Sequence, residues 1–178
     1  MASYLSAALV AGALWGLAPS LALADQATAE MHAVSADGIG DQIGTVELND
    51  DAGELTLTVD IEGLSPGEHG FHLHEHGSCE PAANAQGQMT AALGAGGHYD
   101  PDATSHHRGP EGDGHKGDLP VLVAGSDGRA IAELSAPRLT VAEARGKALM
   151  IHAGGDNYSD EPEPLGGGGA RIACGIVP

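Results

Sequence analysis

The chain has 178 residues, with 25 acidic side chains against seven basic ones and a formal net charge of -18. Recognition of nucleic-acid phosphates needs clustered lysine and arginine, so this charge argues against nucleic acid as a partner. The length is sufficient for one domain around one hydrophobic core.

The N-terminal segment, residues 1–24, contains no charged side chain and ends in the letters ALA, which is typical of a signal-peptidase site. It is short for a membrane-spanning helix, and Pro19 interrupts it. We therefore predict a secretory signal peptide over 1–24, a mature domain over 25–178 and no membrane attachment after cleavage. An uncleaved membrane anchor is the alternative.

The first half of the predicted domain reads as strands, over residues 28–34, 43–49 and 54–61. In the third segment, "ELTLTVDI", apolar residues occupy every second position. This alternation predicts an antiparallel strand with one face in the core and the other in solvent.

The next segment, "GFHLHEHG" at 70–77, has a histidine at every second position. Residues two apart on a strand share a face, so His72 and His74 should stand side by side. We expect His69, just before them, to bond to nearby backbone. For His76, and for His32 far upstream, we expect an ordinary surface position.

Residues 78–119 show no strand or helix periodicity and are rich in glycine, alanine, proline, aspartate and histidine. Loops this long are uncommon in a compact domain unless they are functional or cross-linked. Imidazole and carboxylate groups are typical metal ligands, and the loop holds several of them. They are His98, His106, His107, His115 and Asp118.

After this loop we predict a hairpin over 120–134 with its turn at "GSDG", a helical turn over 141–146, and strands over 147–153 and 170–177. Many short strands with glycine-rich turns favour a sandwich or barrel. Only two cysteines occur, Cys79 and Cys174, and an exported chain meets an oxidising compartment. One disulfide is therefore expected, with two free thiols as the alternative.

Two kinds of metal site follow from the donor types. Three imidazoles and one aspartate satisfy a four-coordinate zinc ion without a thiolate. The group of His72, His74 and His152 offers imidazole nitrogens alone, which suit copper. The spacing thus indicates two imidazole-rich metal sites, but it does not separate an enzyme from a metal store.

Six segments together resemble the exported copper/zinc superoxide dismutases of bacteria, over essentially the whole predicted mature chain. They are "GFHLHEHGSC", "GGHYDP", "HHRGP", "GHKGDLP", "MIHAGGDNYSD" and "GGGGARIACG". The resemblance implies an all-β fold: a Greek-key antiparallel β-sandwich or flattened barrel with two long functional loops. It also implies dismutation of superoxide to dioxygen and hydrogen peroxide, one copper and one zinc ion per subunit, and a periplasmic location.

The same resemblance implies roles for individual residues. His98 would bridge the two ions and pass on a proton. Asp156 would link a copper ligand to a zinc ligand, and Arg171 would attract and orient the superoxide anion. The implied disulfide is Cys79–Cys174. The implied copper ligands are His72, His74, His98 and His152, and the implied zinc ligands are His98, His107, His115 and Asp118, with His106 one residue out of register as the competitor of His107.

One stretch departs from the pattern of bacterial relatives, which often carry a lysine after the "NYSD" segment. Here the chain continues with Glu161, Pro162 and Glu163. We expect these acidic groups to slow the capture of an anion, or else folding to bring cations into the rim, and we expect Glu161→Lys to raise the rate at low salt. The alternative function is a non-catalytic periplasmic copper/zinc store or chaperone, which would have no need of Arg171. Monomer and homodimer both stay open.

Overall fold

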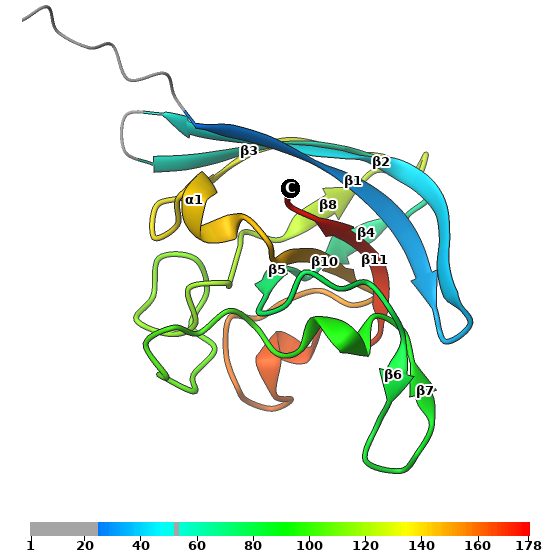
Figure 1. Ribbon diagram of the computed structural model, residues 1–178. Coiled ribbons are helices and arrows are strands. Elements are labelled where there is room, and N and C mark those ends of the chain that lie inside the picture. The colour runs from blue at the N-terminus through cyan, green and yellow to red at the C-terminus, as the bar shows by residue number, and fades with distance from the viewer. Residues whose placement is uncertain (1–24, 52–53) are drawn as a thin grey trace, which may run out of the picture.

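The computed structural model describes residues 25–51 and 54–178, so the predicted signal peptide lies outside the described part. Strands dominate, with one short α-helix and two 3-10 turns (Figure 1). No helix among the described residues is long and apolar enough to span a membrane. The long strands are β1 (Gln26–Ser35), β2 (Gly38–Asp51), β3 (Glu54–Ile61), β5 (Phe71–His74), β9 (Ala130–Ala136), β10 (Ala148–His152) and β11 (Arg171–Ile176).

These seven strands form one antiparallel sheet in the order β5-β10-β11-β1-β2-β3-β9. Two short strands, β4 (Gly67–His69) and β8 (Leu122–Ala124), pair with each other, so the curled sheet and this pair enclose the core. Because β9 and β10 follow each other in sequence but lie far apart in the sheet, their connection crosses the end of the sandwich. This is the expected Greek-key antiparallel β-sandwich with two long loops, and the fold prediction is confirmed.

The alternation in β3 has the expected result. Leu55, Leu57, Val59 and Ile61 are all buried, while intervening residues reach solvent. They join one apolar cluster with Phe71 and Leu73 of β5, Leu149 and Ile151 of β10, and Ala173 of β11. Phe71 and Leu73 therefore point into the core. His72 and His74, which alternate with them along β5, face the other way.

Two expectations about local structure were wrong. The segment 120–134 is not a hairpin: β8 pairs with β4, and β9 pairs with β3. Only the closing bond of the turn, from the amide of Gly125 to the carbonyl of Arg129, joins the two arms. The histidine strand is also shorter than 70–77, since β5 ends at His74.

The first long loop contains more structure than the sequence predicted: strands β6 (Ala82–Ala83) and β7 (Met89–Thr90), which pair as a small hairpin, and a 3-10 turn, η1 (Leu93–Ala95). The hairpin projects from the body of the molecule in Figure 1. The predicted helical turn is α1 (Val141–Ala144). The second long loop, residues 153–170 between β10 and β11, contains another 3-10 turn, η2 (Leu165–Gly167).

The expected disulfide between Cys79 and Cys174 is present, across a separation of 95 residues. It ties the start of the first long loop to β11. Both cysteines are buried in a small apolar cluster with Ala92 and Ala95 of the loop and Met150 of β10. The loop is thus held by a covalent bond and by its own satellite core.

Candidate metal centre

The pairing of β5 on its two sides brings distant histidines together. On one side, β10 lies antiparallel with Met150 opposite His72. On the other side, the first long loop returns and forms single bridges, His72 with Asp118 and His74 with His98. At the far edge of β10, His152 lies opposite Arg171 of β11. Four segments of the chain therefore meet at the end of β5.

The first cluster consists of four buried histidines whose ligand atoms all lie within 4.8 Å of one another: His72, His74, His98 and His152. Three of these rings are held from behind. The Nε2 atom of His72 lies 2.7 Å from Asp156, and the Nδ1 atoms of His74 and His152 lie 3.0 and 3.1 Å from the carbonyl oxygens of Gly96 and Gly169. Their remaining nitrogens point to the shared centre.

Those remaining nitrogens, Nδ1 of His72 and Nε2 of His74 and His152, are buried and have no hydrogen-bond partner among the described residues. Buried polar atoms are normally paired, so three unpaired nitrogens around one point indicate a missing ligand. Burial lowers the pKa of His72 to about 3 and that of His152 to about 4. The rings are therefore neutral at pH 7, as metal binding requires.

The second cluster consists of His98, His107, His115 and Asp118, all buried. The Nδ1 atoms of the three rings lie 3.0, 2.9 and 3.4 Å from one oxygen, Oδ1 of Asp118. A tetrahedral ion with bonds of about 2.0–2.1 Å keeps its ligand atoms about 3.3 Å apart. The four atoms thus have the spacing and chemistry of a four-coordinate zinc site. The other Asp118 oxygen, Oδ2, accepts hydrogen bonds from the amides of Arg108 and Gly109.

His98 belongs to both clusters. Its Nδ1 faces Asp118 in the second cluster, which leaves Nε2 as the nitrogen for the first. Its ring stacks on that of His72 with 4.0 Å between centroids. One imidazole can therefore contact two ions only if both ring nitrogens are free of protons.

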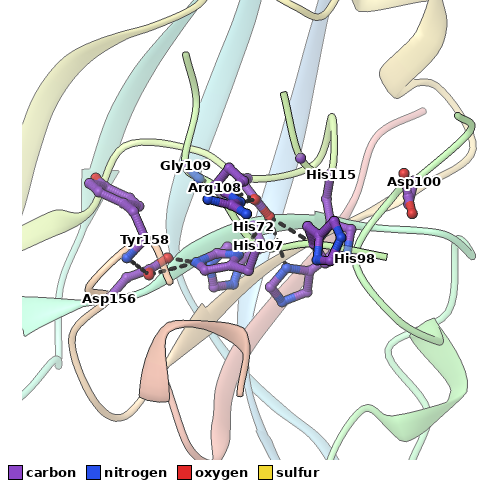
Figure 2. Close-up of polar contacts among 12 residues, drawn as sticks. His72, His98, Asp100, His107, Arg108, Gly109, His115, Asp156 and Tyr158 are labelled. Atoms are coloured by element: carbon purple, nitrogen blue, oxygen red, sulfur yellow. Dashed lines mark hydrogen bonds and ion pairs between the residues drawn. The ribbon is translucent and has the colours of Figure 1, made fainter. Parts of the chain in front are cut away.

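Asp156 joins the two clusters from behind, as Figure 2 shows. Its two oxygens lie 2.7 Å from Nε2 of His72 and 2.7 Å from Nε2 of His107, and the amide of Tyr158 also donates to it. Burial alone would raise the pKa of Asp156, but the bonds to His107 and His72 hold that pKa below its usual range. An ionised Asp156 thus orients one ring in each cluster.

Replacing Asp156 with asparagine should weaken metal binding at both clusters, since loss of such a partner typically costs about 10- to 100-fold in affinity. Competition with a chromophoric chelator would measure this for copper and for zinc. Asp113→Asn is the matched control, because Asp113 is an exposed carboxylate of the first long loop. Equal affinities in Asp156→Asn and wild type would contradict the role of Asp156.

A cavity of about 360 Å³ opens onto the first cluster. Arg171 lines it beside His74, His98 and His152, and its guanidinium donates to the carbonyl oxygens of Ala92 and Gly96, both at 2.6 Å. Burial lowers the pKa of Arg171, yet a guanidinium stays charged at neutral pH. The cavity therefore carries a fixed positive charge beside the imidazoles.

The other histidines lie apart from the clusters. His69 is buried with its Nδ1 2.6 Å from the carbonyl of His152, which is the backbone role expected for it. His106 is exposed beside Asp160, so it is His107 that enters the second cluster. His76 is exposed beside Glu75, and His32 is half-buried on β1, with its Nδ1 3.2 Å from the carbonyl of Gly40.

Two features of the site were not predicted. Gly166 has a positive φ of 72°, and a Cβ atom there would lie 1.9 Å from Asp156, so only glycine leaves room for that carboxylate. Of the acidic residues in the second loop, Glu163 lines the cavity, whereas Glu161 does not. The run of glycines at 166–169 was the sequence signal for the close approach of Gly166 to Asp156. The position of Glu163 depends on how the loop folds, so no sequence signal could have shown it.

Fold and site together define a class: a Greek-key β-sandwich with two adjacent clusters of metal-ligand side chains that share the imidazole of His98. Residues 42–177 match the family model described as "Copper/zinc superoxide dismutase (SODC)". "Superoxide dismutase (Cu-Zn) 2" of Salmonella typhimurium is 55% identical over 149 residues, which cover 83% of this chain and 86% of the relative. The chain belongs to the copper/zinc superoxide dismutase family.

Solved structures of relatives agree with this assignment. The copper/zinc superoxide dismutase from Brucella abortus superposes with a TM-score of 0.84 at 51% identity, covering 86% of this chain and 100% of that one. The monomeric copper, zinc superoxide dismutase from Salmonella enterica gives a TM-score of 0.77 at 53% identity, with the same coverage.

Proposed function

We propose that the chain dismutates superoxide with copper held by the first cluster and zinc held by the second. The observation that carries the proposal is a set of five buried imidazole nitrogens that find no hydrogen-bond partner among the described residues and surround two adjacent points, the first of them beside Arg171. These atoms are Nδ1 of His72, His107 and His115 and Nε2 of His74 and His152.

In this assignment His72, His74, His98 and His152 bind copper, and His98, His107, His115 and Asp118 bind zinc. Copper supplies the one-electron redox couple through which one superoxide is oxidised to dioxygen and a second is reduced to hydrogen peroxide. The donor sets fit, because copper and zinc both accept imidazole and zinc also accepts carboxylate. Asp156 fixes the orientation of the rings of His72 and His107 across the two sites.

The chain's own residues do the rest. Arg171 attracts the anion into the cavity and orients it beside His98 and His152. His98 carries a proton at Nε2 when that nitrogen is not bound to metal, and delivers it to the peroxide product, which needs two. The carbonyls of Ala92 and Gly96 hold the guanidinium in place.

The deciding experiment measures copper and zinc content together with superoxide consumption for the purified protein. The proposal requires about one ion of each metal per chain and rapid consumption. Full copper with no consumption would instead support a metal store or chaperone. The presence of Arg171 in the cavity favours the enzyme, because a store has no use for a cation directed at an anion.

The acidic rim of the cavity should slow substrate capture. Glu163 lines the same cavity as Arg171. A unit charge about 8 Å from an anion in water acts on it with about 0.5 kcal/mol, which is a factor of about two in rate. Glu163→Gln should therefore raise the second-order rate constant about twofold at low ionic strength.

Stopped-flow consumption of superoxide at several salt concentrations would test this, because the gain should shrink as salt screens the charge. Glu161→Gln is the matched control, since Glu161 is exposed in the same loop but does not line the cavity. Equal effects of the two variants would show that Glu163 has no special position.

We also propose that the chain is exported to the periplasm and cleaved before Asp25. The uncharged segment 1–24 and the disulfide Cys79–Cys174 support this, since disulfides persist in oxidising compartments. Mass spectrometry of protein from the periplasmic fraction tests the cleavage site. A homodimer stays a prediction beside the monomer, and light scattering coupled to gel filtration distinguishes the two.

A further inference from the structure

The ring of His115 differs from the other rings of the two clusters. His72, His74, His107 and His152 are each held from behind by a hydrogen bond to the nitrogen that faces away from the cluster. No side-chain hydrogen bond of the described residues holds Nε2 of His115, while its Nδ1 is buried and unpaired. The direction of this ring therefore has to come from the position of its backbone.

The backbone on either side of His115 is hydrogen-bonded to Arg138, in the segment that connects β9 to β10. The guanidinium of Arg138 donates to the carbonyl oxygen of Gly114 at 2.6 Å and to that of His115 at 3.2 Å. The two carbonyls belong to consecutive peptide groups on either side of the His115 Cα. A planar guanidinium bound to both restricts the rotation of that residue.

A second contact, an ion pair, holds the next residue, Lys116. The ammonium of Lys116 donates to Glu143 of α1 at 2.7 Å, and both side chains are only about 30% exposed, at 27% and 31%. Glu143 is itself fixed, because its amide and its carboxylate both bond to the hydroxyl of Thr140 at the start of the helix. Glu143 thus presents a fixed anchor to Lys116.

From the inner side, the amide of His115 donates to the carbonyl of His106 at 2.9 Å. Residues 114–116 are thus held between the loop on one side and the crossing segment on the other. Neither Arg138 nor Glu143 is one of the seven cluster residues or lines the cavity.

We propose that Arg138 and Glu143 are positioning residues for the zinc ligand His115: by fixing the backbone of residues 114–116 they direct Nδ1 of that ring toward Asp118. This inference rests on the zinc site assigned above. It predicts that loosening the contacts lets His115 leave the ion more often, while copper stays bound.

The experiment follows zinc transfer from the metal-loaded, full-length protein to a chromophoric chelator. Arg138→Ala should release zinc about tenfold faster than wild type, in line with the loss of a partner that orients a ligand. Glu143→Gln should give a smaller increase, and Arg138→Lys should lie between Arg138→Ala and wild type. Copper retention should match wild type in all three.

Protein carrying cobalt(II) in place of zinc supplies a second readout that a merely structural role would not change. The visible absorption of cobalt(II) depends on coordination geometry, so Arg138→Ala should shift or weaken the bands. Arg129→Ala is the matched control: it also removes one arginine, whose guanidinium contacts Asp60 of β3 at 2.8 Å and lies away from the clusters.

Wild-type zinc kinetics and cobalt spectra in Arg138→Ala and Glu143→Gln, even with lowered thermal stability, would overturn the inference. If Arg138→Ala does not fold, Glu143→Gln decides alone, because it keeps the shape of the side chain. Failure of the wild type to bind zinc at the second cluster would refute the proposed function instead, so the two failures are distinguishable.

Discussion

Replacing Arg171 with alanine should lower the rate constant for superoxide consumption tenfold or more, with copper and zinc content unchanged. Electrostatic guidance raises association rates by about 10- to 1,000-fold. Arg171 is the only cation that lines the described cavity, and it opposes the acidic charge of Glu163. Its removal leaves Glu163 as the one charged carboxylate or ammonium-type side chain that lines the described cavity, while all seven cluster residues keep their contacts.

Two control variants make this result interpretable. Arg171→Lys keeps the charge but cannot reach both carbonyls, of Ala92 and Gly96, with a planar fork, so partial activity is expected. Arg129→Ala removes a cation elsewhere and should leave the rate unchanged. A wild-type rate in fully loaded Arg171→Ala would show that the guanidinium takes no part in capture.

Metal-free protein should lose stability steeply as the pH falls from about 6.5 to 4. Burial lowers the pKa of His72 to about 3 and of His152 to about 4, against about 6.5 in an unfolded chain. Between these values the unfolded chain binds protons that the folded chain does not, so acid favours unfolding. These two rings alone give a fall of about 2 kcal/mol per pH unit, and burial lowers the pKa of His74 and of His98 in the same direction.

The other titrating groups set the limits of this window. Burial alone would raise the pKa of Asp118, but the close rings of His107 and His98 hold that pKa well below its usual range, so Asp118 loses its stabilising effect only below about pH 4. Burial opposes protonation of His107, but the adjacent carboxylates of Asp118 and Asp156 raise its pKa to about 9. Its contribution is full below pH 6.5 and is lost as the pH rises toward 9.

Urea unfolding at pH 7, 6, 5 and 4 would measure this trend in metal-free and metal-loaded protein. Bound metal occupies the nitrogens that would otherwise titrate, so the loaded protein should show a flatter profile until acid releases the ions. A flat profile for the metal-free protein would mean that the rings are not buried without metal.

The predictions from sequence succeeded where one local pattern decides the structure. The two-residue alternation in β3 and β5 depends only on strand geometry, so it correctly placed Leu55 and Leu57 in the core and His72 beside His74. The disulfide followed from the presence of only two cysteines and a predicted signal peptide. Recognition of the family motifs supplied the candidate ligands on loops, which no periodicity could have selected.

The errors arose where partners distant in sequence decide. The segment 120–134 has every local sign of a hairpin. In the closed sandwich, however, β8 pairs with β4 and β9 pairs with β3. The acidic residues 161 and 163 look equivalent in sequence, yet only Glu163 lines the cavity. The hydrogen bonds from Arg138 to the carbonyls of residues 114 and 115 could not be predicted from the sequence either, because they depend on the path of the segment that connects β9 to β10.

The disulfide gives this enzyme a built-in dependence on its surroundings. Cys79 packs with Ala92 and Ala95, in the stretch whose carbonyls hold Arg171. Where thiols stay reduced, that stretch loses its covalent bond to β11, and the two carbonyls that bind the guanidinium of Arg171 are held less firmly in place. In a reducing compartment the chain would therefore be a poor catalyst even with both ions loaded, and oxidation of the two cysteines would complete the entrance for its substrate.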